Sequence, residues 1–108
     1  MPNLVDELAD DLEMERDEVL HLLSVYLKAC QEDLRQASQA VASADGALLA
    51  THAHSIKGAS ANLKIEDARA AAEALETMGR SGTMTEAATQ IARLEAALTR
   101  VQAEMNRP

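Results

Sequence analysis

The sequence predicts an all-α protein, an antiparallel up-down four-helix bundle with a short additional N-terminal helix. Its 108 residues include only four glycines and two prolines, and both prolines lie at the chain ends. A many-turned β fold would need more of both residue types at its turns. Apolar residues recur at spacings of three and four along most of the chain, which is the period of an amphipathic helix. We expect one domain over residues 1–108, because this length is typical of a single domain.

The first helix is expected at residues 4–12. Asn3 is a suitable N-cap, and Asp6 lies in the first turn, where the helix dipole favours negative charge. One apolar stripe consists of Leu4, Val5, Leu8 and Leu12. Because the helix is short, we expect it to cover one end or edge of the bundle.

The second helix, expected at residues 15–42, gives the clearest structural signal. Its apolar positions alternate in steps of three and four residues, which produces an unbroken heptad-like seam. The seam consists of Leu20, Leu23, Leu27, Cys30, Leu34, Ala37 and Val41. Cys30 is the only cysteine, so it cannot form an internal disulfide, which fits a reducing compartment. Its place on the seam predicts a buried side chain.

The third helix is expected at residues 46–63 and the fourth at residues 66–79. Asp45 precedes the third helix as a suitable N-cap. Gly79 and Gly82 are expected to mark the end of the fourth, because glycine favours helix C-termini. The connections between the helices are short, so neighbouring helices should be antiparallel.

The fifth helix is predicted to begin with the capping box formed by Thr83 and Glu86. Its apolar positions again follow steps of three and four. They are Ala87, Ile91, Leu94, Leu98, Val101 and Met105. With the second, third and fourth helices, this element completes the four-helix bundle.

His54, in the third helix, is predicted to point away from the core. On a helical wheel the apolar side chains of this helix fall within roughly 60° of the side opposite His54. That core side holds Leu49, His52, Ile56, Ala59, Ser60 and Leu63. The neighbours of His54 on its own face are Ala47, Ala50, Lys57, Gly58 and Ala61, and four of these five have the smallest side chains available. This bare face would let another protein approach the imidazole closely.

A solvated imidazole has a pKa near 6.5, so a large neutral, nucleophilic fraction exists at cellular pH. Lys57 lies three residues beyond His54, within reach of a phosphoryl group on the ring. Gly58 costs about 1 kcal/mol of helix propensity relative to alanine, and close approach of a partner would explain it. The residues therefore favour phosphoryl transfer through His54, with Lys57 stabilising the charge and Gly58, Ala47, Ala50 and Ala61 as docking residues.

The stretch from Ala53 to Leu63, Ala-His-Ser-Ile-Lys-Gly-Ala-Ser-Ala-Asn-Leu, resembles the signature of histidine-containing phosphotransfer (HPt) domains. Tyr26-Leu27, Asp45 and Leu75-Glu76 agree with flanking features of that family. The sequence departs from the family at Lys64, where a glycine usually follows the leucine, and this leaves the end of the third helix open.

The resemblance implies that His54 is phosphorylated and that Lys57 and Gly58 support and expose it. The implied partners are the receiver domain of a response regulator or a hybrid sensor kinase, with Mg²⁺ on the receiver and no cofactor on this chain. The chain would then be a phosphoryl carrier of a two-component phosphorelay rather than an enzyme, which agrees with the absence of a nucleotide-binding motif from the sequence.

Composition excludes several other classes of partner. The formal net charge is −8, and no cluster of basic residues offers a nucleic-acid footprint or attracts an anionic membrane surface. No apolar run approaches the roughly 18 to 20 residues of a membrane span. No secretory signal is visible at the N-terminus, so we expect a cytoplasmic protein, and a complete bundle suggests a monomer.

Two alternative functions remain open from the sequence. The chain could be a helical adaptor whose bare face binds a partner without phosphoryl transfer, or the phosphoacceptor domain of a chemotaxis-type kinase. A metal site is not expected, because His52 and His54 are two residues apart and point to opposite sides of a helix. His52 is instead expected at the core boundary, with a hydrogen-bond partner.

Overall fold

The computed structural model describes residues 3–108, and its regular elements are all helices, which confirms the predicted all-helical class. Most helix ends lie within two residues of their expected positions. The helices are α1 (Leu4–Leu12), α2 (Arg16–Ala42), α3 (Gly46–Asn62), α4 (Glu66–Ser81) and α5 (Ala87–Met105). None of these five helices combines the length and the apolar character that crossing a membrane would require.

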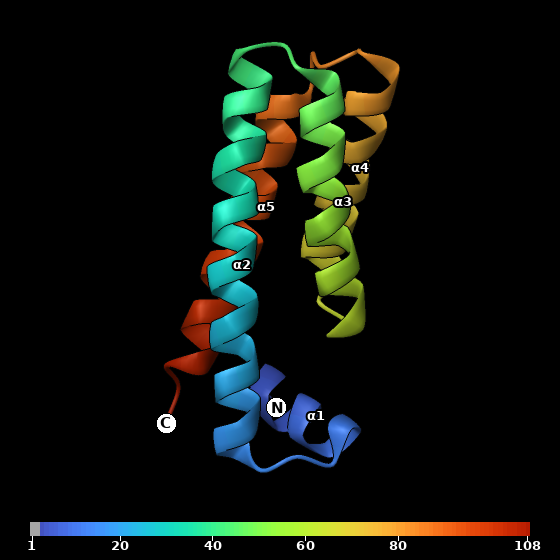
Figure 1. Ribbon diagram of the computed structural model, residues 1–108. Coiled ribbons are helices and arrows are strands. Elements are labelled where there is room, and N and C mark those ends of the chain that lie inside the picture. The colour runs from blue at the N-terminus through green and yellow to red at the C-terminus, as the bar shows by residue number, and fades with distance from the viewer. Residues whose placement is uncertain (1–2) are drawn as a thin grey trace.

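Helices α2 to α5 lie side by side along the longest dimension of the molecule, which measures 42 Å (Figure 1). Each contacts the next one in the chain, and α5 also contacts α2, so the four enclose a common core. The N-terminal part of α2 extends past the end of α3, and α1 lies there (Figure 1). Val5 and Leu8 of α1 are buried, and α1 contacts α2 and α5. Helix α1 therefore packs against α2 and α5.

Both predicted N-caps are confirmed. The Asn3 side chain accepts a hydrogen bond from the Asp6 backbone N–H at 2.9 Å, and Asp45 accepts one from the Leu48 N–H at 3.1 Å. Each bond satisfies one of the free donors at a helix start. Asp45 thereby fixes the start of α3, the helix that carries the candidate site.

The buried face of α2 is wider than the predicted seam. Leu23, Leu27, Cys30 and Ala37 are buried as expected, whereas Leu20, Leu34 and Val41 are only partly buried. Val19, Tyr26 and Ala40 are buried as well. Because α2 contacts α1, α3 and α5, it needs a broad apolar face rather than the narrow seam of a two-stranded coiled coil.

The predicted capping box at the start of the fifth helix is wrong. Helix α5 begins at Ala87, and no side-chain hydrogen bond caps it at Glu86. Thr83 instead donates its backbone N–H to the Ser81 hydroxyl, and Met84 packs partly buried against the core. The packing of Met84 in this connection outweighs the local capping preference, as tertiary contacts commonly do.

Gly79 does not end the fourth helix, contrary to the sequence-based prediction. Helix α4 continues to Ser81, and Gly82 ends it in the left-handed conformation with φ of 77°. Gly79 is buried where α4 meets α3, and a Cβ atom there would lie 2.5 Å from the Gly46 carbonyl oxygen and 2.7 Å from the Ala50 nitrogen. Glycine is required at this position because the two helix backbones touch.

We expect Gly79→Ala to destabilise the fold by about 1 to 3 kcal/mol, because the added methyl group overlaps backbone atoms that cannot move aside easily. Gly58→Ala is the matched control. A Cβ at Gly58 meets no atom within 4 Å, so this change should stabilise α3 by about 1 kcal/mol. Thermal unfolding of the two variants measures the contrast. Equal melting temperatures would contradict the close contact between α3 and α4.

Lys64 takes the conformation that glycine would favour after α3. Helix α3 ends at Asn62 rather than at 63, and Lys64 follows with φ of 56°. The turn is held by a hydrogen bond from the Ile65 N–H to the Ser60 carbonyl at 2.9 Å. Lys64 therefore makes the turn that glycine would favour, at a cost of about 1 to 2 kcal/mol of backbone strain.

Candidate functional site

His54 lies on the outer surface of α3, with its side chain 63% exposed. The prediction that it points away from the core is confirmed. Ala53 and Ile56, on either side of it in the sequence, are completely buried. Packing of these two side chains fixes the rotation of α3, so that His54 must face outward.

The imidazole of His54 is held by a buried carboxylate on the neighbouring helix. His54 Nδ1 lies 2.9 Å from Oε2 of Glu76 in α4, whose side chain is only 4% exposed. The hydrogen bond from Lys57 is the main cause that lowers the pKa of Glu76 below its ordinary value, against the effect of burial. The carboxylate is therefore ionised and can only accept. It follows that Nδ1 of a neutral His54 carries the proton and Nε2 keeps its lone pair.

Glu76 also binds two cations, one at each oxygen. Lys57 Nζ lies 2.6 Å from Oε1, and Arg80 lies 2.6 Å from Oε2, the oxygen that also accepts from His54. The Lys57 side chain is 30% exposed and that of Arg80 is 69% exposed. A single buried negative charge thus organises an imidazole, an ammonium and a guanidinium at the surface.

The predicted docking residues divide into two groups. Ala47, Gly58 and Ala61 are exposed, and Gly58 has open space around it, as expected for a bare face. Ala50 is partly buried, because its backbone contacts Gly79 across the junction of α3 and α4. Ala50 therefore differs from the expectation and lies at the border of the exposed face.

A small, open pocket lies beside His54 on the N-terminal side of α3. Ala50, Thr51, His54 and Arg80 line it. Because Lys57 lies on the C-terminal side of His54, the imidazole stands between two cationic side chains. The pocket is open to solvent, so a group bound to Nε2, the ring nitrogen of His54 that does not contact Glu76, could enter it.

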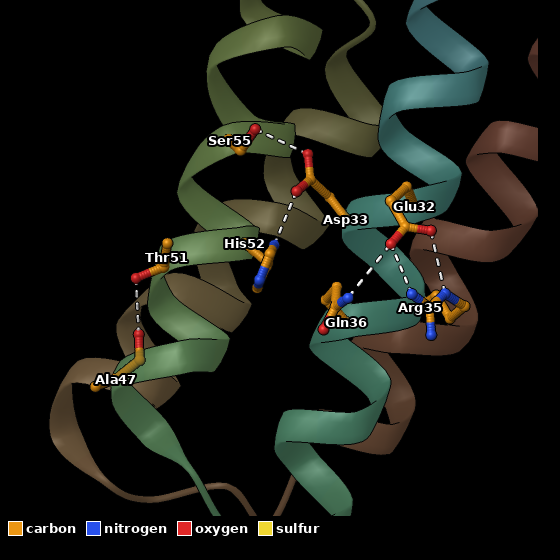
Figure 2. Close-up of polar contacts among 8 residues, drawn as sticks. All are labelled: Glu32, Asp33, Arg35, Gln36, Ala47, Thr51, His52 and Ser55. Atoms are coloured by element: carbon orange, nitrogen blue, oxygen red, sulfur yellow. Dashed lines mark hydrogen bonds and ion pairs between the residues drawn. The ribbon is translucent and has the colours of Figure 1, made fainter.

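The side of α3 that faces α2 is fixed by polar contacts (Figure 2). Asp33 of α2 accepts hydrogen bonds from His52 Nδ1 and from the Ser55 hydroxyl, both at 2.8 Å. The expectation that His52 is a boundary histidine with a hydrogen-bond partner is confirmed. Deeper in the bundle the hydroxyl groups of Tyr26 and Ser60 are 2.7 Å apart and buried. These contacts hold α3 in the orientation that presents His54.

Histidine, cysteine and carboxylate side chains do not gather into a metal site anywhere in residues 3–108. His52 and His54 bind different carboxylates on different helices, Asp33 and Glu76. The two rings therefore serve separate hydrogen bonds, in line with their expected opposite orientation.

Sequence reasoning identified His54, Lys57 and Gly58 but assigned no role to Glu76 or Arg80. Glu76 is 22 residues from His54, and no periodicity within one helix connects the two. The sequence offered two signals at Glu76: the pair Leu75-Glu76 agrees with a flanking feature of the Hpt family, and an arginine follows four residues later, a spacing that usually indicates an exposed ion pair. The contact between α3 and α4 reveals that this glutamate is buried beneath His54.

Residues 21–104 match the family model of the Hpt domain. The match covers most of the chain, and the chain therefore belongs to the Hpt domain family. Hpt domains are phosphoryl carriers of two-component signalling rather than complete enzymes. A search of curated proteins and a search of solved structures each gave no significant match.

Proposed function

We propose that this protein is a histidine phosphotransfer protein of a two-component phosphorelay. His54 accepts a phosphoryl group on Nε2 and exchanges it with the aspartate of a receiver domain, in a response regulator or a hybrid sensor kinase. The observation that carries this proposal is the exposed ring of His54, whose Nδ1 is bound to Glu76 while Nε2 has no hydrogen bond to any part of residues 3–108.

In the proposed step the Nε2 lone pair attacks the phosphorus of the phospho-aspartate on the partner. The Nε2–P bond forms, the P–O bond to the aspartyl group breaks, and the aspartate carboxylate leaves with the electron pair. No proton needs to leave His54, because the Nδ1 proton stays in the hydrogen bond with Glu76. The ring becomes an imidazolium, and the carboxylate stabilises it, as in other carboxylate–histidine pairs.

The same contact favours the reverse step. Nitrogen is a better leaving group when the ring stays protonated at Nδ1, so Glu76 keeps the phosphorylated ring ready to pass the group on. Phosphoryl transfer depends mainly on positioning and charge stabilisation, and the partner would supply Mg²⁺. The domain needs only a well-oriented nucleophile and nearby cations.

The surroundings of His54 support docking of a receiver. Gly58, Ala47 and Ala61 leave the face of α3 uncovered, and Ala50 borders it. We further propose that the domain works as a cytoplasmic monomer on an antiparallel up-down four-helix bundle. In support, the contacts of α2 to α5 close one common core, and Cys30 is buried within it.

Incubation with a receiver domain carrying ³²P-labelled phospho-aspartate tests the proposal. Label should appear on the wild-type chain and be absent from His54→Gln, whereas His21→Gln, at an exposed position on α2, should be labelled normally. The label should be labile in acid and stable in base, as a P–N bond is. A receiver that binds without transferring label would identify a helical adaptor instead, and a base-labile label would indicate an acyl phosphate at another residue.

We expect Lys57→Ala to slow transfer about tenfold without abolishing binding of the receiver. The ammonium would stabilise the transferring phosphoryl group, and its partial exposure reduces the effect through solvent screening. Lys28→Ala, at an exposed position on α2, is the matched control. Rapid-quench measurement of the transfer rate checks this prediction, and an unchanged rate would remove the proposed role of Lys57.

A further inference from the structure

Arg80 has no assigned role in the proposed transfer, yet its guanidinium reaches the candidate site. Arg80 and His54 bind the same atom, Oε2 of Glu76, at 2.6 and 2.9 Å. Their nitrogen atoms are thus separated by a single oxygen. Arg80 also lines the pocket that opens beside the His54 ring.

The charges around Glu76 do not balance. One carboxylate is shared by two permanent cations, Lys57 and Arg80, while a neutral His54 adds no charge. The site therefore has one positive charge in excess, in a chain whose formal net charge is −8. A phosphoryl group adds close to two negative charges and three acceptor oxygens. Both cations are needed to bring the phosphorylated site near neutrality.

The two cations differ in freedom to move. Lys57 is 30% exposed and holds Oε1 alone, whereas Arg80 is 69% exposed and shares Oε2 with His54. If Arg80 leaves, His54 still occupies Oε2 and Lys57 still occupies Oε1, so the buried carboxylate remains hydrogen-bonded. An arginine can also bind two phosphoryl oxygens at once through its planar fork of donors.

We propose that Arg80 is a second phosphoryl-binding residue, which exchanges Glu76 Oε2 for the phosphoryl oxygens when His54 is phosphorylated. The pocket that Arg80 lines with Ala50 and Thr51 lies beside the His54 ring, where the guanidinium can reach a phosphoryl group on Nε2. The inference rests on the proposed phosphorylation of His54. It adds that the phosphorylated state is stabilised from α4 as well as from α3.

The experiment measures the equilibrium constant for phosphoryl exchange with a receiver domain, using wild-type protein, Arg80→Ala, Arg80→Lys and Arg69→Ala. Arg69 is the matched control, because it also lies on α4 and forms ion pairs with glutamates three and four residues away. Loss of Arg80 should shift the equilibrium toward the phosphorylated receiver by about three- to tenfold. Arg80→Lys should recover part of this shift, and Arg69→Ala should show none.

The equilibrium constant separates phosphoryl binding from a purely positioning role. A residue that only orients His54 would change the forward and reverse rates equally and leave the equilibrium unchanged. Unchanged equilibria in Arg80→Ala, with normal labelling of the wild type, would overturn the inference and leave the proposed function intact. Absence of label from the wild type would overturn both.

Discussion

Glu76→Gln is expected to lower the rate of phosphoryl transfer roughly a hundredfold. The amide has nearly the same size but no charge, so it cannot stabilise the imidazolium formed when Nε2 attacks phosphorus. In another enzyme, replacing the carboxylate of a carboxylate–histidine pair by an amide lowers the catalytic rate about ten-thousandfold. Mutating the hydrogen-bond partner of a metal-binding histidine typically lowers metal affinity or activity about ten- to a hundredfold. Lys57 and Arg80 would also lose their shared counter-ion.

Single-turnover transfer from a phosphorylated receiver measures this effect. The matched control is Glu73→Gln, a surface glutamate of the same helix that pairs with Arg69. Its transfer rate should equal that of the wild type. If Glu76→Gln transferred phosphate at the wild-type rate, Glu76 would have no part in holding the proton of His54.

The same carboxylate predicts a pH dependence of stability. The pKa of Glu76 is lower in the folded protein than its ordinary value, chiefly because Lys57 donates a hydrogen bond to it. The contribution of ionised Glu76 to the free energy of unfolding is therefore complete above the pKa of the unfolded state, which is about 4.3. This contribution is lost as the pH falls through the lower pKa of the folded state. The difference in unfolding free energy between wild type and Glu76→Gln should shrink in this acid range. A difference that stays constant down to the acid transition would contradict the assignment.

Gly58→Gln is expected to reduce transfer at least a hundredfold while the protein stays as stable as the wild type or becomes more stable. Gly58 is exposed, one turn beyond His54, and a Cβ atom added there would have no other atom within 4 Å. A long side chain there would keep the receiver's aspartate away from Nε2, and positioning errors of about 1 Å can cost a hundredfold. Replacing a mid-helix glycine should stabilise α3 by about 0.5 to 1 kcal/mol.

Transfer rates and thermal unfolding, measured on the same samples, check both halves of this prediction. Ala92→Gln places the same side chain on an exposed position of α5, which does not carry the site, and should leave transfer unchanged. An unfolded Gly58→Gln would show that Gly58 is packed inside. Normal transfer by this variant would show that the receiver does not approach His54 across this part of α3.

Features of the fold that depend on residues close together in the sequence could be predicted from the sequence. The caps at Asn3 and Asp45 are local hydrogen bonds within one helical turn, and the long apolar pattern of α2 identifies that helix without reference to its partners. The start of α5 and the position of Gly79 could not be predicted, because packing between helices decides both. Local sequence preferences predict that a helix begins at Thr83 and that a helix ends at Gly79. The packing of Met84 against the core and the close contact of Gly79 with Gly46 outweigh these two preferences.

The candidate site likewise has features that follow from local sequence and features that depend on packing between helices. The outward direction of His54 follows from the helical period of α3 alone, and the i+3 position of Lys57 follows with it. The network around Glu76 could not be derived in this way, because it joins α3 and α4 across the close contact at Gly79. Arg80 was missed for the same reason, because the burial of its partner Glu76 depends on the packing of α4 against α3.

Nuclear magnetic resonance of the phosphorylated, ¹⁵N-histidine-labelled protein tests the central claim most directly, because coupling between ³¹P and ¹⁵N identifies the nitrogen that carries phosphorus. With Nδ1 bound to Glu76 and Nε2 facing solvent, the phosphorus should be attached to Nε2 of His54, and Nδ1 should remain protonated. Phosphorus on Nδ1 of His54, or on any other residue, would contradict the account.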